Sequence, residues 1–331
     1  MKKSTAATLI VLIIGVCLAL AGFAAGGMKA FWVDRDGFHI SQTDKGNVVV
    51  VDETYNSFTN INVDADFLDR ITIKEGDSYS VKGRNHSRNG GIDLRLDGDT
   101  LIVKATQKKG GWAINFWEGS WFGLGSFERG DYRIEITYPA GARLGSVRSN
   151  LSAGDTRIQG IVCETLDARS DFGKVEVSSA KCESMDIKSN AGDVVVDMAE
   201  VSGKIVINND FGKVDIGDVT TTVISLKLNA GDLRASNVKT GDVSARNDFG
   251  QIVFDGLEFE GLCEIKNSSG DISLSLSMNE DSVGYELSTT AGSVTVDGQK
   301  YGGSVVNRLT GAGASLKVDA DFGTIKVKFA G

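Results

Sequence analysis

Proline is almost absent from this chain of 331 residues, which contains one, Pro139, against 41 glycines. Proline cannot donate a backbone hydrogen bond to a sheet, so its scarcity favours a chain built mostly of strands. Histidine occurs only twice and cysteine four times, with no Cys-x-x-Cys pair or His ligand set to suggest zinc. Basic charge is not in excess either. The formal net charge is −9, so we expect no nucleic-acid partner.

The sequence also lacks a recognisable catalytic constellation. His39 and His86 are isolated, and neither accompanies a nucleophile motif. The triplet Asp-Phe-Gly occurs four times, but it recurs with a fixed period and without the other kinase motifs, so we interpret it as a turn. The acidic residues are spread along the chain rather than clustered, which disfavours a polysaccharide-active β-helix enzyme. We therefore expect no enzyme activity, no cofactor and no metal.

What the sequence does have is a glycine that recurs every 19 or 20 residues. The regular landmark glycines are Gly154, Gly173, Gly192, Gly212, Gly231, Gly250 and Gly270, and Gly292 and Gly323 follow at wider spacings. Apolar residues at every second position flank each one, which is the pattern of a strand with one buried face. This period predicts an all-β fold, a parallel β-solenoid or β-helix with about 19–20 residues per coil.

The residue before each landmark glycine alternates between large and small. The large residues, which we interpret as structural turns, are Phe172, Phe211, Phe249 and Phe322. The small residues are Ala153, Ala191, Ala230, Ser269 and Ala291. Neighbouring strands lie roughly 4.8 Å apart, so a small residue between two rings leaves each ring room. The alternation therefore predicts a repeating unit of two coils.

The residue after each glycine alternates in charge and predicts a structural ladder along the solenoid. Its members are Asp155, Lys174, Asp193, Lys213, Asp232 and Asp271, with Gln251 as an interruption. If the coils stack in register, each acid lies beside a base, an arrangement that contributes about 0.2–1 kcal/mol per pair. A second, basic row, four residues before the glycine, consists of Arg169, Lys188, Lys227, Arg246 and Lys266, with Asn208 as the exception. It is either a solvated face balanced by acids or a surface for an anionic polymer.

Two cysteines, Cys163 and Cys182, occupy matching positions in successive coils. Adjacent strands bring such residues within range of a disulfide, and an exported protein meets oxidising conditions. The sequence leaves open whether they are bonded or pack as free thiols. Cys263 lies in an apolar column and is expected to be a free thiol.

Residues 1–33 form a membrane anchor or a signal segment, and residues 34–46 form a polar linker. Two lysines precede an apolar run from Ala6 to about Ala25, which is long enough to span a bilayer as a helix. The alternative is a cleaved signal peptide, because Ala19-Leu20-Ala21 suits a signal peptidase. We expect a single-pass protein of the cell membrane with the solenoid outside the cytoplasm. Secretion after cleavage is the alternative.

Residues 47–140 read as a β-rich region that leads into the regular solenoid repeats of residues 141–331. This region contains an aromatic loop, residues 110–130, whose candidate contact residues are Trp112, Phe116, Trp117, Trp121 and Phe122. The loop either caps the solenoid, or dips into the membrane interface, or stacks on a glycan or protein. At the other end, Lys326 and Lys328 predict a charged terminal strand that discourages end-to-end stacking.

Three features together resemble a known family. They are the short apolar N-terminus, the segment Ile134-Glu135-Ile136-Thr137-Tyr138-Pro139-Ala140-Gly141, and repeats such as Ser189-Asn190-Ala191-Gly192-Asp193-Val194. Over roughly residues 40–329 the chain resembles the bacterial putative-adhesin family of β-strand-repeat proteins, a domain of unknown function. The resemblance implies an anchored surface protein, with members near envelope-stress regulators, and it implies no catalytic residues.

The leading hypothesis is a non-enzymatic, adhesin-like or envelope-associated interaction module. Its candidate partners are the membrane, through the N-terminal helix, and an envelope glycopolymer, lipid or protein. A regulatory component that senses envelope stress or an antimicrobial ligand through the aromatic loop is the second hypothesis. The polysaccharide-active enzyme is the third.

Overall fold

The computed structural model describes residues 30–34, 37–40, 48–86, 91–105, 112–115, 132–307 and 313–330. The chain divides into two compact units. The smaller comprises Met1–Asn47 and Lys108–Gly130, and the larger comprises Val48–Gln107 and Asp131–Gly331. The predicted membrane helix falls on residues outside the described part. Within the described residues, no helix has the length and apolar character needed to cross a membrane.

The smaller unit contains a three-stranded antiparallel sheet in the order β2-β1-β8. Its strands are β1 (Ala30–Asp34), β2 (Gly37–Ile40) and β8 (Trp112–Asn115). The central strand β1 pairs with β2 on one side and with β8 on the other. Strand β2 therefore lies inside the segment predicted as a linker, and β8 inside the predicted aromatic loop.

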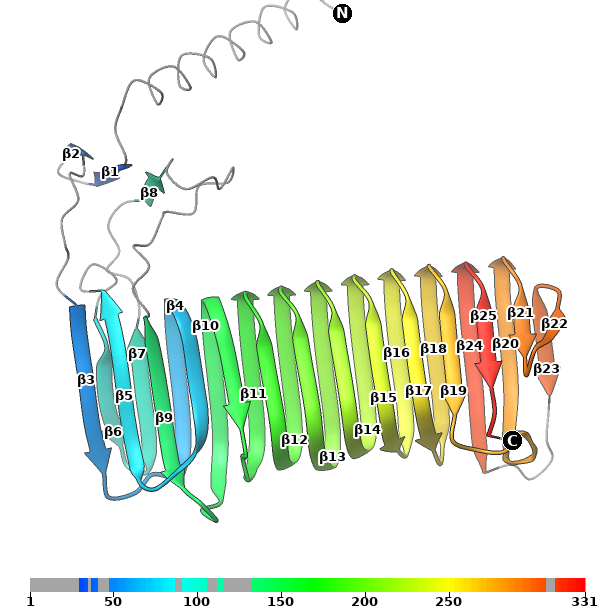
Figure 1. Ribbon diagram of the computed structural model, residues 1–331, viewed down its shortest axis with the longest axis horizontal. Coiled ribbons are helices and arrows are strands. Elements are labelled where there is room, and N and C mark those ends of the chain that lie inside the picture. Colours follow the sequence, from blue (N-terminus) through cyan, green and yellow to red (C-terminus); the bar gives the residue numbers. More distant parts are fainter. Residues whose placement is uncertain are drawn as a thin grey trace, which may run out of the picture. The chain divides into compact units, whose positions relative to one another are not determined.

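The larger unit is one 22-stranded sheet wound into a parallel solenoid (Figure 1). Its regular strands are β10 (Leu144–Gln159), β11 (Cys163–Phe172), β12 (Val175–Ala191), β13 (Val194–Phe211), β14 (Val214–Ala230), β15 (Leu233–Thr240), β16 (Asp242–Phe249), β17 (Ile252–Phe259), β18 (Leu262–Ser269) and β19 (Ile272–Leu276). From β10 to β17, each paired residue lies beside the residue 19 or 20 positions later in a parallel ladder, as in Val175 with Val194. The predicted all-β parallel solenoid and its coil length are confirmed.

Every coil contains two strand segments joined by the glycine turn at one edge. Alternate side chains of both segments point inward and form one hydrophobic core, in which Val177 and Ile187 are fully buried. The 20-residue coil between Gly192 and Gly212 absorbs its extra residue as a bulge between Val201 and Lys204. The core therefore keeps its register although the coil length varies.

A second column of turns, unforeseen from the sequence, kinks the first segment of each coil. Its non-glycine members have left-handed backbone angles, and they are Ser179, Met198, Asp218 and Asn237, with φ of 53°, 51°, 50° and 52°. Glycine takes the same place in two other coils, at Gly160 and Gly256. Short polar side chains such as those of asparagine and aspartate can stabilise this backbone conformation by local hydrogen bonds, but the side chain of methionine cannot.

At the N-terminal end the order of coils in space differs from the order in sequence. The strands are β3 (Val48–Tyr55), β4 (Asn60–Gly76), β5 (Tyr79–His86), β6 (Asp93–Asp97), β7 (Thr100–Ala105) and β9 (Arg133–Pro139). Strand β4 pairs in parallel with β10 on one side and with β7 and β9 on the other. The β-rich region therefore shares the sheet of the solenoid, and antiparallel strands β3, β5 and β6 follow at its end.

The C-terminal end shows the same inversion. Its elements are the 3-10 turn η2 (Glu280–Ser282) and strands β20 (Val283–Ala291), β21 (Val294–Val296), β22 (Gln299–Tyr301), β23 (Ser304–Asn307), β24 (Ala314–Phe322) and β25 (Ile325–Lys328). The last coil, β24 and β25, lies between β18/β19 and β20/β21, as the red strands between the gold and the orange ones show (Figure 1).

The prediction that a charged strand ends the solenoid is therefore wrong. Lys326 and Lys328 are exposed, but their strand β25 is paired on both sides, with β19 and β21. The end of the sheet is instead formed by β22 and β23, which run antiparallel to β21 and β20. An antiparallel hairpin replaces charge as the means of ending the parallel ladder.

Candidate functional site at the glycine edge

The landmark glycines form one edge of the solenoid, which we call the glycine edge. It consists of the turns around Gly154, Gly173, Gly192, Gly212, Gly231, Gly250, Gly270, Gly323 and Gly292, in spatial order. The glycines pack closely: a methyl group on Gly212 would lie 2.3 Å from the carbonyl oxygen of Gly192. The backbone φ of +130° at Gly212 also suits glycine. Both facts require glycine in this column.

The large and small residues before the glycines stack in one column along this edge. The column reads Phe67, Ala153, Phe172, Ala191, Phe211, Ala230, Phe249, Ser269, Phe322 and Ala291. The alternation predicted from the sequence thus continues through the inverted coils at both ends.

The phenyl rings of this column lie on the outer surface and not in the core. Phe172, Phe211, Phe249 and Phe322 are 55–63% exposed. Successive rings are two coils apart, roughly 9.6 Å by strand spacing. Large apolar side chains are seldom left exposed in such a regular row, and a contiguous exposed apolar patch usually marks an interaction site.

A polar column runs beside the rings, two residues before each glycine. Asn190 donates an amide hydrogen bond to Asp171 (2.7 Å), and Asn229 donates one to Asp210 (2.7 Å). The aspartates belong to the Asp-Phe-Gly turns and the asparagines to the turns between them. In these two pairs the carboxylate of one coil is thus held by the amide of the next, which gives Asp171 and Asp210 a structural role.

The predicted charge ladder is in register, but its acids contact backbone rather than ammonium groups. The Oδ1 atom of Asp155 accepts the backbone N–H of Lys174 at 3.1 Å, and that of Asp193 accepts the N–H of Lys213 at 2.9 Å. Asp232 and Asp271 accept the N–H groups of Gln251 and Thr324 in the same way, at 3.0 and 2.8 Å. Because only an N–H is required, the interruption at Gln251 does not break the ladder.

Inside the same turns, a third column supplies buried amides. Asn209, Asn247 and Asn267 lie three residues before their glycines and are almost fully buried. The Nδ2 atom of Asn247 donates to the carbonyl of Gly231 at 2.9 Å, and Asn267 donates to Gly250 at 2.8 Å. The sequence signal for this column was a polar residue at a position where the alternation of apolar residues predicts an inward-facing side chain.

A sequence profile of the family described as Toastrack DUF4097 matches residues 58–252 and 203–328. The chain belongs to the Toastrack DUF4097 family. This membership confirms the resemblance drawn from the repeat motifs. No curated protein matches the chain.

Several solved structures are similar to this Toastrack chain. A putative adhesin from Bacteroides fragilis is 12% identical over 88% of this chain and 100% of the other, with a TM-score of 0.44. A putative cell adhesion protein from Clostridium sporogenes is 12% identical, covers 86% and 100%, and has a TM-score of 0.28. A putative adhesin from Parabacteroides distasonis is 10% identical, covers 86% and 98%, and has a TM-score of 0.35.

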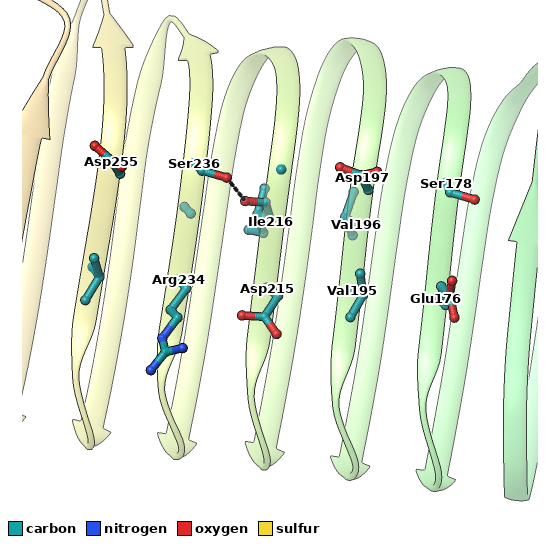
Figure 2. A pocket seen from close by; sticks show the side chains of 13 residues that line it. Glu176, Ser178, Val195, Val196, Asp197, Asp215, Ile216, Arg234, Ser236 and Asp255 are labelled. Atoms are coloured by element: carbon teal, nitrogen blue, oxygen red, sulfur yellow. Dashed lines mark hydrogen bonds between the residues drawn. The ribbon is translucent and has the colours of Figure 1, made fainter.

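The Toastrack solenoid also has a shallow hollow of about 490 Å³ on the outer face of its first segments (Figure 2). Gly217 lies between Asp197 and Ser236 of the neighbouring coils. Asp215, from the same strand as Gly217, and Asp197 and Arg234, from the coils on either side, also line the hollow. At its margin, burial of Glu176 acts to raise the pKa of that carboxyl, but hydrogen bonds from Arg157 and Lys174 outweigh it and lower the pKa. The hollow is open and shallow, and its acids do not converge on one point.

Four of the five members of the basic row of this Toastrack chain, all except Lys227, are paired with acids on their own strands. Arg169 lies 3.0 Å from Asp167, and Lys266 lies 2.9 Å from Glu264. Lys188 is likewise 3.5 Å from Asp186. These pairs leave little positive charge for an anionic polymer, which favours the interpretation as a balanced, solvated face.

The cysteines of the Toastrack solenoid are buried free thiols. A hydrogen bond between Cys163 and Cys182 raises the pKa of the Cys163 thiol and lowers that of Cys182. Burial raises the pKa of the Cys263 thiol. Of the two alternatives that the sequence leaves open for Cys163 and Cys182, the structure has the free thiols.

The predicted aromatic contact surface is placed only in part. Trp112 begins β8, where its backbone lies opposite Val33 of β1. Phe116, Trp117, Trp121 and Phe122 lie outside the described residues. Within the described part of the chain, no group of three or more metal-ligating side chains is brought together. The glycine edge is thus the described surface on which exposed side chains repeat most regularly. The sequence did not predict that its rings are exposed, because periodicity does not distinguish a turn whose side chains point inward from one whose side chains point outward.

Proposed function

We propose that the protein is a non-enzymatic, adhesin-like interaction module of the cell surface. An N-terminal transmembrane helix holds it in the cell membrane, and the solenoid lies outside the cytoplasm. The glycine edge is the surface that contacts the partner. The apolar run of the first residues supports the anchor, and the Toastrack family membership suits a surface domain.

The observation that carries this proposal is the row of exposed phenyl rings. Four rings, each more than half exposed, follow one another along a single edge of a rigid stack. Burying an exposed ring against a partner releases roughly 1.5–3 kcal/mol before the costs of association are subtracted. Keeping four of them in water has no benefit for folding, so a partner that covers them is the simplest reason for their presence.

The repetition of the site supports an extended contact rather than a reaction. Catalysis needs several different groups that converge on one reacting atom. The glycine edge instead presents the same groups every second coil, an arrangement suited to an elongated partner. Envelope glycopolymer, lipid and protein are the candidate classes.

The test compares the full chain with a variant that removes the rings. Phe172, Phe211, Phe249 and Phe322 are replaced together by serine, which we call the edge variant. Both proteins are produced in cells, and an impermeant labelling reagent reports whether the solenoid is exposed outside. Retention of the full chain, purified in detergent, on isolated envelopes is then measured. We expect external labelling of both proteins and loss of retention for the edge variant.

A matched control replaces four apolar residues that are exposed elsewhere on the larger unit. These are Val50, Met198, Leu262 and Val306, which are 48–68% exposed. Serine at these positions removes a similar number of exposed apolar side chains and should leave retention unchanged. Equal retention of the wild type, the edge variant and the control would refute the glycine edge as the contact surface, and labelling only after cell lysis would refute the outward orientation.

A further inference from the structure

The glycine edge contains two kinds of turn that differ at every outward position. One kind, the Phe turn, is typified by Asp210-Phe211-Gly212-Lys213. The other, the Ala turn, is typified by Asn229-Ala230-Gly231-Asp232. At equivalent positions the Phe turn has a phenyl ring, a base and a carboxylate where the Ala turn has a methyl group, an acid and an amide. The two turns are therefore complementary to each other.

From this pattern we infer that the partner of the glycine edge is a second copy of the same chain, bound antiparallel so that each Phe turn lies over an Ala turn. The inference rests on the proposed function, because it names the partner of the surface proposed there. The contact is isologous, with a two-fold axis that lies in the interface and runs across the stack of coils.

The symmetry decides which residues meet. A two-fold axis across the stack reverses the order of the coils but keeps each column over the same column of the partner copy. With the axis between the coils of Gly212 and Gly231, Phe211 meets Ala230 and Lys213 meets Asp232, twice each. Farther out, the pairs that meet are Phe172 with Ser269, Phe249 with Ala191, and Phe322 with Ala153.

The irregular members of the repeat fit this same register. Lys174 meets Asp271, so the opposite charges persist two coils away from the axis. Gln251 meets Asp193 and can donate a hydrogen bond to its carboxylate. In the polar column, Asp210 meets Asn229, and Asp248 meets Asn190. No position in this register places two like charges or two rings together.

Other arrangements are penalised by the same residues. A shift by one coil sets ring on ring and Lys213 on its own copy, and like charges about 4 Å apart repel by roughly 1 kcal/mol even in water. An axis along the stack pairs every coil with itself and reverses the order of the columns, so no Phe turn can lie over an Ala turn and the complementary contacts are lost. The alternation thus selects an antiparallel register, as complementary charges do in other specific pairings.

The charged groups nearest the axis are available, whereas the ammonium of Lys174, two coils away from the axis, already lies 3.2 Å from Glu176 of its own chain. Within the described part of the chain, no ion pair involves Lys213, Asp193 or Asp232. Each aspartate uses its Oδ1 atom for the next coil and leaves the second oxygen for a partner. Lys213, Asp193 and Phe211 are all exposed.

The area suffices for a specific dimer. Eight rings from two copies, each roughly half exposed, contribute about 800 Å² of buried surface. The flanking Asp, Asn and Lys side chains bring the total to about 1,200 Å² or more, the lower range of specific interfaces. Because the axis runs across the stack, the β3 ends of the two copies lie at opposite ends of the dimer.

Sedimentation velocity of the full chain in detergent, over a range of concentrations, tests the inference. We expect the wild type and the control variant (Val50, Met198, Leu262 and Val306 to serine) to dimerise. The edge variant should be monomeric, with a dissociation constant raised about a hundredfold or more. All three contain the same N-terminal segment, so association through that segment cannot explain a difference. A monomeric wild type, or an edge variant that dimerises as well as the wild type, would overturn the inference.

A charge exchange tests the register without touching the rings. Lys213→Asp should weaken the dimer, because it brings two carboxylates together at each side of the axis. Adding Asp232→Lys to the same chain should restore it, and circular dichroism checks that both variants are folded. If the double variant dimerises no better than Lys213→Asp, the proposed register is wrong.

The envelope assay separates this inference from the proposed function. A wild type that is monomeric, but loses envelope retention when the rings are removed, would overturn the homophilic contact and leave the glycine edge as a surface for a glycan, lipid or other protein. A dimer that requires the rings, together with loss of retention in the edge variant, supports both.

Discussion

Replacing Gly212 by alanine should destabilise the solenoid far more than the same change at an isolated turn. At Gly212 a methyl group would meet the carbonyl oxygen of Gly192 at 2.3 Å and its carbon at 2.7 Å, and both are backbone atoms that cannot rotate away. The φ of +130° is also unfavourable for alanine. The angle costs about 1–3 kcal/mol and the clash a further 1–3 kcal/mol, so we expect a loss of about 2–6 kcal/mol.

The matched control is Gly141→Ala. Gly141 has a φ of +80°, so alanine is strained there too, but no atom lies within 4 Å of the added methyl group. The expected loss is the conformational term alone, about 1–2 kcal/mol. The difference between the two variants isolates the close approach of neighbouring coils from the backbone angle.

Guanidinium unfolding of the full chain, followed by far-UV circular dichroism, measures both losses. Repeat proteins can unfold coil by coil, so hydrogen exchange of the amides around Gly212 should show whether the loss is local. Equal losses for the two variants would refute the close packing of the glycine column. A Gly212→Ala protein as stable as the wild type would refute the stacking of the turns altogether.

Four further outcomes are expected. Met198→Gly should stabilise the fold by about 0.5–1 kcal/mol in the same unfolding assay, because Met198 adopts a left-handed angle and is exposed. Asn247→Ala should cost about 1–3 kcal/mol, because the carbonyl of Gly231 loses its buried donor, and a loss below that of a surface substitution would contradict this role. Ending the chain at Asn307 removes β24 and β25, so limited proteolysis should cut β20 to β23 first. A truncated chain as resistant as the wild type would contradict the inverted coil order. Burial raises the pKa of Cys263 and keeps the thiol protonated, so iodoacetamide at mildly alkaline pH should modify it only after unfolding.

The sequence predicted the regular coils well because each one is specified locally. The glycine spacing, the alternation of apolar residues and the two-coil alternation of Phe172 with Ala191 all act between adjacent coils, and they appear in the register. The sequence Asp97-Gly98-Asp99 is a local hairpin signal of the same kind, and β6 and β7 pair there with Asp97 opposite Thr100. Short-range patterns of this kind need no knowledge of the remaining chain.

The order of the end coils could not be predicted, because it depends on pairings between distant segments. Residues 283–296 follow β18 and β19 in the sequence and carry an alternating apolar pattern like that of β24 and β25, yet β24 and β25 lie next to β18 and β19. The wider spacing before Gly323 indicated an irregularity, but it did not indicate which strands the last coil would pair with. The ladder contact was missed for another reason: the charge pattern of Asp193 and Lys213 describes side chains, while the bond formed uses a backbone N–H.

The most direct test of the glycine edge as the contact surface is hydroxyl-radical footprinting of the full chain on intact cells. The same chain, diluted in detergent, is the reference state. The account predicts that Phe172, Phe211, Phe249 and Phe322 are modified several-fold less on cells than in the diluted protein, while exposed Met198 is modified equally in both. Equal modification of the four rings in the two states would contradict it.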